Sequence, residues 1–493
     1  MSASTLTSLF SPASLTVIAA CTLYGTFIGA MPGLTATMAV ALLVPFTYFM
    51  DPLIAISAIV ATTTTAIFAG DVPGTLMRIP GTPASAAYVE DAYRLSRAGR
   101  SRSTLMVSLF AACIGGLVGV ALLALIAPQL ARVAVQFSSF ETFWLACLGL
   151  SCAVLTSNGS VAKSFSSLFL GLFIATIGID VAVGHPRFTF GNYELFDGIS
   201  FIPAIIGLFA LSEILRSAQI GHRDQPANAA QESFSKALHE AALVLRRFKR
   251  NIARSSVLGT LIGALPGAGA DIAAWICYAI SRRFSRHPER YGTGYIEGVT
   301  DGGSANNAAI GGAWTPALVF GIPGDSVTAI AIGILLLNGM SPGPQIFTES
   351  PELVHTLYGA FALSNLAMIP AGLLVIMASS QVVRIPRRVL MPCVLLFSLV
   401  GAYAITNSVI AIWTVLALGA LGYAMEANGF PLAPAILGIV LGTIVEENFM
   451  TSMMKAQGDL LAFFDRPWAA ALGTLTLLLW ALLLTRGIYE SVQ

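Results

Sequence analysis

The chain has 493 residues, of which 56% are apolar and only 10% charged, and its formal net charge is +1. A soluble globular protein carries about 25% charged residues, so this composition excludes an ordinary soluble fold and indicates a chain that lies in lipid. The near-neutral charge offers no basic surface for nucleic acid. The first basic residue is Arg78. Because a signal peptide begins with positive charge, we expect no cleavage at the N-terminus.

Apolar runs recur along the chain at lengths near the about 20 residues that cross a bilayer. In chain order they cover residues 104–127, 140–155, 164–179, 201–215, 353–379, 389–406, 409–425, 433–445 and 468–484. Several further runs are interrupted by Pro-Gly. A backbone in lipid must satisfy its own hydrogen bonds, and long apolar runs do so as helices. The sequence therefore predicts an all-α polytopic membrane protein.

Two motifs occur twice, almost half a chain length apart. Residues 25–33 read GTFIGAMPG, and residues 259–267 read GTLIGALPG. A shorter element, a proline followed six residues later by Ile-Pro-Gly, begins at Pro73 and again at Pro316, at a slightly larger spacing. Gly/Pro breaks at corresponding positions of two halves are typical of secondary transporters, which bind solute where the helices are interrupted. Solute transport is therefore the leading hypothesis.

Basic residues gather in four segments, which the positive-inside rule assigns to the cytoplasm. They are Arg94 to Arg102, Arg216 to Arg254, Arg282 to Arg290 and Arg384 to Arg388. Residues 94–102, after the first copy of the shorter motif, carry four arginines, whereas residues 341–353, after the second copy, carry none. The two copies thus end on opposite sides of the membrane, which predicts inverted-topology repeats. We assign residues 1–218 to the first transmembrane repeat, 219–251 to a cytoplasmic linker and 252–493 to the second repeat.

The segment between Arg254 and Arg282 is too short to cross the bilayer twice at about 20 residues per crossing. It fits a re-entrant hairpin broken at Pro266 and Gly267. The helix that leaves such a tip presents free N–H groups and the positive end of its dipole, which favour an anion. Thr35 and Thr37 after the first tip, and Asp271 after the second, are placed to meet a solute or a cation.

Polar side chains also cluster within an apolar context between Asp301 and Asn307, and again from Gly324 to Thr328. One interpretation is hydrogen bonding between helices that small residues allow to pack closely. The other is coordination of a carboxylate or of Na⁺. The candidate substrate-binding residues are Pro32, Gly33, Thr35, Thr37, Arg78, Pro80, Gly81, Thr82, Pro266, Gly267, Gly269, Asn306, Asn307, Pro323, Gly324, Asp325 and Ser326.

Ionisable side chains at membrane depth cost about 2.5 to 3.5 kcal/mol on insertion scales and are functional by default. Asp71, Asp271, Asp325 and the nearby Thr328 are candidates for coupling to an ion. Arg78 either grips a solute carboxylate in bidentate fashion or is neutralised by Asp71 or Asp325 as a structural pair. The histidines fall in loops or at the start of an apolar run, so we expect no metal site and no cofactor beyond a coupling ion.

These motifs, together with Asn306-Asn307 and Gly311-Gly312, resemble the TctA family, the large membrane subunit of tripartite tricarboxylate transporters. The resemblance covers nearly the whole chain and is most specific from Glu297 to Gly324. It implies a permease of the bacterial inner membrane, driven by a Na⁺ or H⁺ gradient, that works with a small TctB-type membrane subunit and a periplasmic TctC-type binding protein. It also implies a carboxylate solute, and the hairpins make an elevator-like movement plausible.

The chain departs from the usual family pattern near the expected site. Asp71, Arg78 and Asp325 stand where serine, asparagine and a small uncharged residue are usual, which puts citrate itself in doubt. One alternative is therefore a transporter of a different organic solute, or a proton-driven one. An intramembrane enzyme is a weaker alternative, because the sequence assembles no nucleophile, base or metal set. A channel is weaker again, because duplicated hairpins favour an occluded site over an open pore.

Overall fold

The computed structural model describes residues 9–32, 34–156, 160–180, 184–219, 232–266, 269–337, 339–382 and 387–492. In the first half the elements are α2 Pro12–Gly29, α3 Ala36–Thr47, α4 Pro52–Ala69, α5 Asp71–Met77, η1 Ser85–Ala87, α6 Val89–Arg97, α7 Ser101–Ala134, α8 Ser139–Thr156, α9 Val161–Ala175, β1 Gly178–Ile179, β2 Pro186–Arg187, η2 Tyr193–Leu195, α10 Phe201–Ile205, the π-helical turn η3 Ile206–Leu211 and α11 Ser212–Gln219. The second half comprises α12 Phe234–Arg247, α13 Lys249–Gly263, α14 Gly269–Phe284, η4 Pro288–Arg290, α15 Ile296–Phe320, α16 Ser326–Leu337, α17 Ile346–Glu349, α18 Pro351–Val382, α19 Arg387–Thr406, α20 Val409–Ala427, α21 Leu432–Lys455, η5 Leu461–Phe464 and α22 Pro467–Val492.

The prediction of an all-α polytopic membrane protein is confirmed. Seven helices in the described part of the chain are long and apolar enough to cross a membrane. The apolar run at 164–179 is shorter than predicted as a helix, because α9 ends at Ala175 and Gly178 then adopts a φ of +125°. Residues 178–179 and 186–187 instead form a small antiparallel ribbon, in which Gly178 pairs with Arg187.

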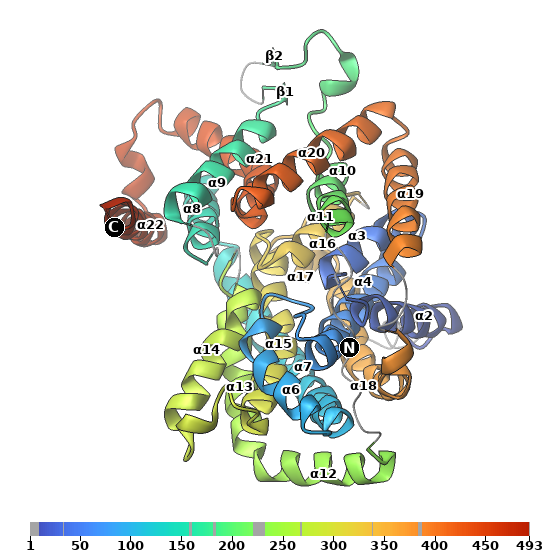
Figure 1. The fold of residues 1–493 in the computed structure, drawn as a ribbon. Coiled ribbons are helices and arrows are strands. Elements are labelled where there is room, and N and C mark those ends of the chain that lie inside the picture. Colours follow the sequence, from blue (N-terminus) through green and yellow to red (C-terminus); the bar gives the residue numbers. More distant parts are fainter. Residues whose placement is uncertain are drawn as a thin grey trace.

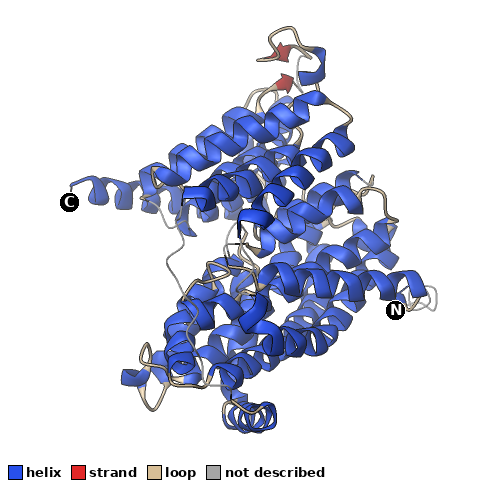
Figure 2. Ribbon diagram, turned by 45° about the vertical axis from the view of Figure 1, so that its right-hand side comes forward, coloured by secondary structure: helices blue, strands red, loops and turns tan. Residues whose placement is uncertain are grey.

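The helices form two groups with a gap between their ribbons (Figure 1; Figure 2). One group contains α2, α4, α7, α13, α14, α15 and α18, among which α7 with α15, α13 with α15, and α2 with α4 make the most extensive contacts. The other contains α8, α9, α20, α21 and α22. Helices α3 and α16 lie between the two groups in Figure 1, and α3 also contacts η3 and α19, which pack against α20 of the second group.

The repeated glycines are helix-packing residues. A Cβ on Gly25 would lie 2.5 Å from the carbonyl oxygen of Thr62, and one on Gly29 would lie 2.3 Å from that of Ala66, so α2 and α4 approach backbone to backbone. In the second half, Gly259 meets Ala305 and Gly263 meets Ala309 in the same way, at 2.7 and 2.4 Å from the carbonyl oxygens. Small residues permit such close crossings within a membrane. The longer motif therefore performs the same packing in both halves.

The shorter motif also adopts one local geometry twice. Arg78 ends α5 with a φ of +62°, and Gly321 ends α15 with a φ of +67°. The following isoleucine donates its N–H back to the motif proline, at 3.4 Å in the first half and 3.3 Å in the second. Helix ends of this kind, in which an N–H beyond the last helical residue bonds back to a carbonyl within the helix, need a left-handed residue. Glycine adopts that conformation freely, whereas arginine adopts it at a cost.

Each Ile-Pro-Gly turn leads into a reciprocal pair of hydrogen bonds. The Thr82 N–H donates to the Ser85 hydroxyl at 3.1 Å, and the Ser85 N–H donates to the Thr82 hydroxyl at 3.0 Å. Asp325 and Thr328 make the equivalent pair, at 2.9 Å and 2.7 Å. Capping pairs of this kind satisfy the first N–H groups of a helix. They explain why hydroxyl and carboxylate side chains follow the breaks.

Helices α13 and α14 form the predicted hairpin in outline, as two short helices that contact each other on either side of Pro266. The two helices approach closely at these ends, because a Cβ on Gly269 would lie 2.2 Å from the Ile262 carbonyl oxygen. Gly267 lies outside the described residues. The linker assigned to residues 219–251 contains α12, which packs on α7 and carries Glu240, the ion-pair partner of Arg100.

The connection between α14 and α15, residues 285–295, contacts the first half of the chain. Asp91 on α6 accepts three backbone N–H groups from it: Gly292 at 3.1 Å, Gly294 at 2.8 Å and Tyr295 at 2.9 Å. The Tyr278 hydroxyl donates to the same carboxylate at 2.6 Å. We call this arrangement the Asp91 clasp. It joins α6 to α14 and α15.

Candidate functional site

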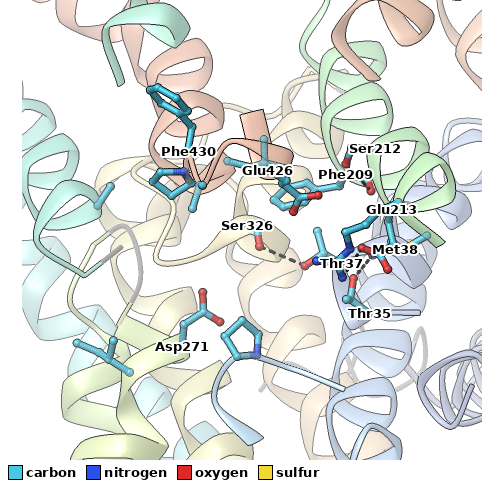
Figure 3. A pocket seen from close by; sticks show the side chains of 18 of the residues that line it. Thr35, Thr37, Met38, Phe209, Ser212, Glu213, Asp271, Ser326, Glu426 and Phe430 are labelled. Atoms are coloured by element: carbon cyan, nitrogen blue, oxygen red, sulfur yellow. Dashed lines mark hydrogen bonds and ion pairs between the residues drawn. The ribbon is translucent and has the colours of Figure 1, made fainter. Parts of the chain in front are cut away.

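A cavity of about 510 Å³ lies between the two groups of helices. Its polar and charged lining consists of Thr35, Thr37, Ser212, Glu213, Arg216, Asp271, Ser326 and Glu426, and its aromatic lining includes Phe209, Trp275 and Phe430. The starts of α3, α14 and α16 form one wall, and α11 with the connection from α20 to α21 forms the opposite wall (Figure 3). Residues from both halves of the chain therefore face one space.

A narrower chamber of about 40 Å³ adjoins this cavity. The two share Thr35, Thr37, Pro83, Asp271 and Ser326. The chamber adds Thr82, Asn306 and Asp325 to the lining. We refer to the cavity and the chamber together as the central cavity.

Three helices begin at the central cavity. The Thr35 side chain caps α3 by accepting the Met38 N–H at 3.2 Å, and Thr37 in the first turn of α3 hydrogen-bonds to Ser326, the first residue of α16, at 3.1 Å. Asp271 lies in the first turn of α14. Helix N-termini carry partial positive charge and unpaired N–H groups, both of which favour a bound anion. This wall can therefore receive a negatively charged group.

Asn306 connects the central cavity to a buried carboxylate. Its amide nitrogen lies 3.2 Å from the Tyr88 hydroxyl and 3.5 Å from that of Thr82. Tyr88 in turn donates to Asp71 at 2.8 Å, and Ser108 donates to the other oxygen of Asp71. Thr82, Tyr88 and Asp71 belong to the first half and Asn306 to the second. Hydrogen bonding thus couples the two halves beside the cavity.

The structure brings some of the predicted site residues together and leaves others apart. Those that line the central cavity are Thr35, Thr37, Thr82, Asp271, Asn306, Asp325 and Ser326. Pro32, Pro80, Gly81, Pro266, Gly269, Pro323 and Gly324 shape the turns that hold these side chains but do not line it, and Gly33 and Gly267 lie outside the described residues. Of the predicted ion-coupling residues, Asp271 and Asp325 face the cavity, Thr328 caps α16 together with Asp325, and Asp71 lies behind Tyr88.

The polar side chains of residues 301–307 lie in three different surroundings. Asn306 faces the cavity, whereas the Asn307 amide donates to the Thr64 carbonyl at 3.1 Å and contacts the Met368 sulfur at 3.7 Å. Asp301 is fully buried and accepts from Ser255 and Ser281 and, at 3.1 Å, from Asn251. Successive helical residues point about 100° apart, so neighbours in the sequence face different partners. For Asn307 and Asp301 the observed contacts are between helices.

Arg78 is not paired with Asp71 or Asp325, the two partners that the sequence suggested. Its side chain is 61% exposed, and its Nε atom lies 2.7 Å from Glu90, which also pairs with Arg94. The hydrogen bond from Arg94, with a smaller contribution from the Arg78 charge, lowers the pKa of Glu90. Arg78 is the left-handed end of α5, and this conformation directs its side chain to the surface rather than into the central cavity.

Replacing Arg78 by glycine is expected to change the free energy of unfolding by less than about 1 kcal/mol, because relief of the left-handed strain offsets the loss of an exposed ion pair. The rate of solute uptake is expected to stay within about twofold of the rate of the unaltered protein, since an exposed ion pair contributes little free energy. The measurements are thermal unfolding of the purified protein and solute uptake by the reconstituted transporter. Arg78→Val, which keeps the strain, should lower stability. Loss of uptake in a stable glycine variant would restore Arg78 as a solute-binding residue.

Sequence reasoning missed the residues of the opposite wall. Arg216 was assigned to a cytoplasmic loop, yet it lines the cavity and forms a 2.8 Å ion pair with Glu213. Glu426 lines the same wall near the end of α20, and one of its carboxylate oxygens is buried without a hydrogen bond. An acidic residue at the end of an apolar run was the available signal for Glu426. Nothing in the sequence placed α11 beside α20.

The charges around the central cavity are unbalanced. Its lining contains four carboxylates, on Glu213, Asp271, Asp325 and Glu426, and Arg216 is the one basic side chain among the described residues that line it. The described residues hold no group of three or more His, Cys, Asp or Glu side chains arranged to bind a metal ion. The excess of negative charge therefore has to be met by the helix N-termini, by protons or by cations.

Broken helices from two halves, meeting at a cavity lined by polar and charged side chains, define a polytopic membrane protein of the transporter class. Residues 15–437 match the tripartite tricarboxylate transporter TctA family. The chain belongs to this family, which confirms the resemblance noted in the sequence. It is accordingly a membrane transporter component of tricarboxylate transport, in a transporter family rather than an enzyme family.

Two similar proteins come from Agrobacterium vitis. The chain is 32% identical over 450 residues to an uncharacterized 52.8 kDa protein of the TAR-I ttuC' 3' region, an alignment that covers 91% of this chain and 89% of that protein. It is 35% identical over 179 residues to an uncharacterized protein of the TAR-II ttuC' 3' region, covering 36% of this chain and 74% of that protein. No solved structure matches the chain.

Proposed function

We propose that the chain is the large permease subunit of a binding-protein-dependent tripartite transporter, which takes up a carboxylate solute across the bacterial inner membrane by using an ion gradient. The observation that carries this proposal is the convergence of three helix N-termini on the central cavity, with Thr37 and Ser326 joined across the two halves. N–H groups and helix dipoles are suited to a carboxylate. Asn306 and Arg216 supply further hydrogen-bond donors.

Coupling to cations follows from the charge of the lining. A solute carboxylate that enters beside Glu213, Asp271, Asp325 and Glu426 is repelled unless protons or Na⁺ ions enter too. A bound ion and a bound solute then favour each other, and each shifts the protein toward the loaded state by its differential affinity. The negative charge of the lining therefore supports symport of the solute with either Na⁺ or H⁺.

Movement of one helix group relative to the other is the proposed route for the solute. The central cavity lies between the groups, and the matched contacts of Gly25 with Thr62 and of Gly259 with Ala305 support a pair of structural repeats. Inverted repeats provide two related conformations that open to opposite sides of a membrane. An elevator-like displacement of the group that contains α13, α14 and α15 would carry the wall of helix N-termini with it.

The partners proposed for the chain are those of its family, a small TctB-type membrane subunit and a periplasmic TctC-type binding protein. The decisive experiment reconstitutes all three proteins in liposomes and measures uptake of labelled di- and tricarboxylates under separate inward Na⁺ and H⁺ gradients. Saturable uptake of one anion under one gradient is the expected result. If no carboxylate enters through an intact complex, the solute belongs to another chemical class.

A further inference from the structure

Asp71 is a buried carboxylate with no positively charged partner. Its side chain is 5% exposed, and it follows directly after α4 in the segment 52–77, which is long and apolar enough to cross a membrane. Its two oxygens accept hydrogen bonds from Tyr88 and Ser108. Among the residues that the structure describes, no lysine, arginine or histidine forms an ion pair with it. A buried charge at this depth is costly unless a cation or a proton compensates it.

A small cavity lies directly against this carboxylate. Its volume is about 10 Å³, and its polar lining consists of Asp71, Thr75, Ser85, Tyr88 and Ser108. A space of this size holds about one water-sized sphere. Carboxylate and hydroxyl oxygens are the ligands that hard cations prefer, and a single carboxylate balances a single positive charge. The chemistry and the size of this cavity fit a small monovalent cation.

The cavity is also connected to the central cavity through one side chain. Tyr88 donates to Asp71 and accepts from Asn306, and Asn306 lines the central cavity beside Thr82. An ion that neutralises Asp71 weakens the hydrogen bond from the Tyr88 hydroxyl to the carboxylate. The Tyr88 hydroxyl also accepts from the Asn306 amide, so its reorientation changes the position of that amide. Ion binding and solute binding therefore act on the same hydrogen-bonded chain.

We propose that Asp71, Ser108, Ser85, Thr75 and Tyr88 form a binding site for one Na⁺ ion. The site deepens the proposed function, because it names the coupling ion and its ligands. Tyr88 and Asn306 form the link between the ion and the solute. Ser108 on α7 and Tyr88 beside α6 place the site between elements of the first half. Asn306 on α15 connects the site to the second half.

The test measures Na⁺ binding to the purified chain without solute. Thermal unfolding is followed in NaCl and in KCl or choline chloride at the same ionic strength. A saturable rise in Tm of about 2 °C or more in NaCl alone is expected, because a ligand that binds only the folded state stabilises it. Asp71→Asn, which keeps the shape of the side chain, should abolish the rise. Ser108→Ala should raise the Na⁺ concentration at half-effect about fivefold, through loss of one hydroxyl ligand.

Asp51→Asn is the matched control, because it is the same substitution at the exposed start of α4, where asparagine caps as well as aspartate. Asp51→Asn should keep the full rise in Tm in NaCl. A rise that persists in Asp71→Asn, or an equal Tm in all salts for the unaltered chain, overturns the proposed site. Uptake by the three-protein complex is scored separately. If the complex takes up no carboxylate but Na⁺ raises the Tm in an Asp71-dependent way, the proposed solute is wrong and the ion site stands. If the complex takes up a carboxylate but Na⁺ does not raise the Tm, the ion site is wrong.

Discussion

Asn306→Ala is expected to lower the initial rate of solute uptake about tenfold in liposomes that hold the complete transporter. The substitution removes the amide that contacts both the Tyr88 and Thr82 hydroxyls at the edge of the central cavity. Loss of such buried hydrogen bonds costs about 1 to 2 kcal/mol, and 1.4 kcal/mol corresponds to a factor of ten. The Na⁺ concentration that gives half-maximal uptake should rise as well, because the same amide contacts the Asp71 network.

The neighbouring Asn307 supplies the control for this experiment. Its amide donates to the Thr64 carbonyl, away from the central cavity. Asn307→Ala should therefore reduce stability, by about 1 to 2 kcal/mol, while uptake per folded molecule is unchanged. The opposite pattern, with solute uptake sensitive to Asn307 and indifferent to Asn306, would show that the solute binds on the α4 and α18 side of α15.

Gly263→Val is expected to be the most destabilising single substitution considered, at about 3 kcal/mol or more. A Cβ at this position would lie 2.4 Å from the Ala309 carbonyl oxygen and 2.7 Å from the Ala309 Cα, so helices α13 and α15 would have to separate. Backbone atoms cannot move aside as a flexible side chain can. Thermal unfolding in detergent, with the amount of folded protein recovered, measures the effect.

Two further variants make this experiment specific. Gly29→Val, which faces the Ala66 carbonyl oxygen at 2.3 Å, should have an effect of similar size in the first half. Leu261→Val lies on the same helix as Gly263 but is 51% exposed, and it should leave stability nearly unchanged. A mild effect of Gly263→Val would mean that α13 is free to move away from α15 and does not pack tightly in the folded state.

Sequence patterns predicted the helices and half of the site for clear physical reasons. An apolar run of about 20 residues has few alternatives to a membrane helix, and a Pro-Gly break must lie in protein or beside a cavity. Thr35, Asp271 and Ser326 follow such breaks directly, so their position at the central cavity could be predicted from local sequence alone.

The remainder of the site depends on information that the sequence does not carry locally. Arg216 and Glu426 reach the cavity because α11 packs beside α20, a contact between segments some two hundred residues apart. Asn306 and Asn307 could not be told apart without the rotation of α15 relative to its neighbours. Arg78 looked like a membrane-depth charge, and only its left-handed backbone conformation shows why the side chain leaves the helix toward Glu90.

The Asp91 clasp makes the two halves of the chain unequal partners. It is built from the long connection of residues 285–295, whereas α3 and α4 are joined by residues 48–51, too few to form a matching loop. Four hydrogen bonds to this one carboxylate hold α6, from the first half of the chain, against α14 and α15 of the second half. We therefore expect α6, α14 and α15 to behave as a single rigid body in any conformational change of the protein.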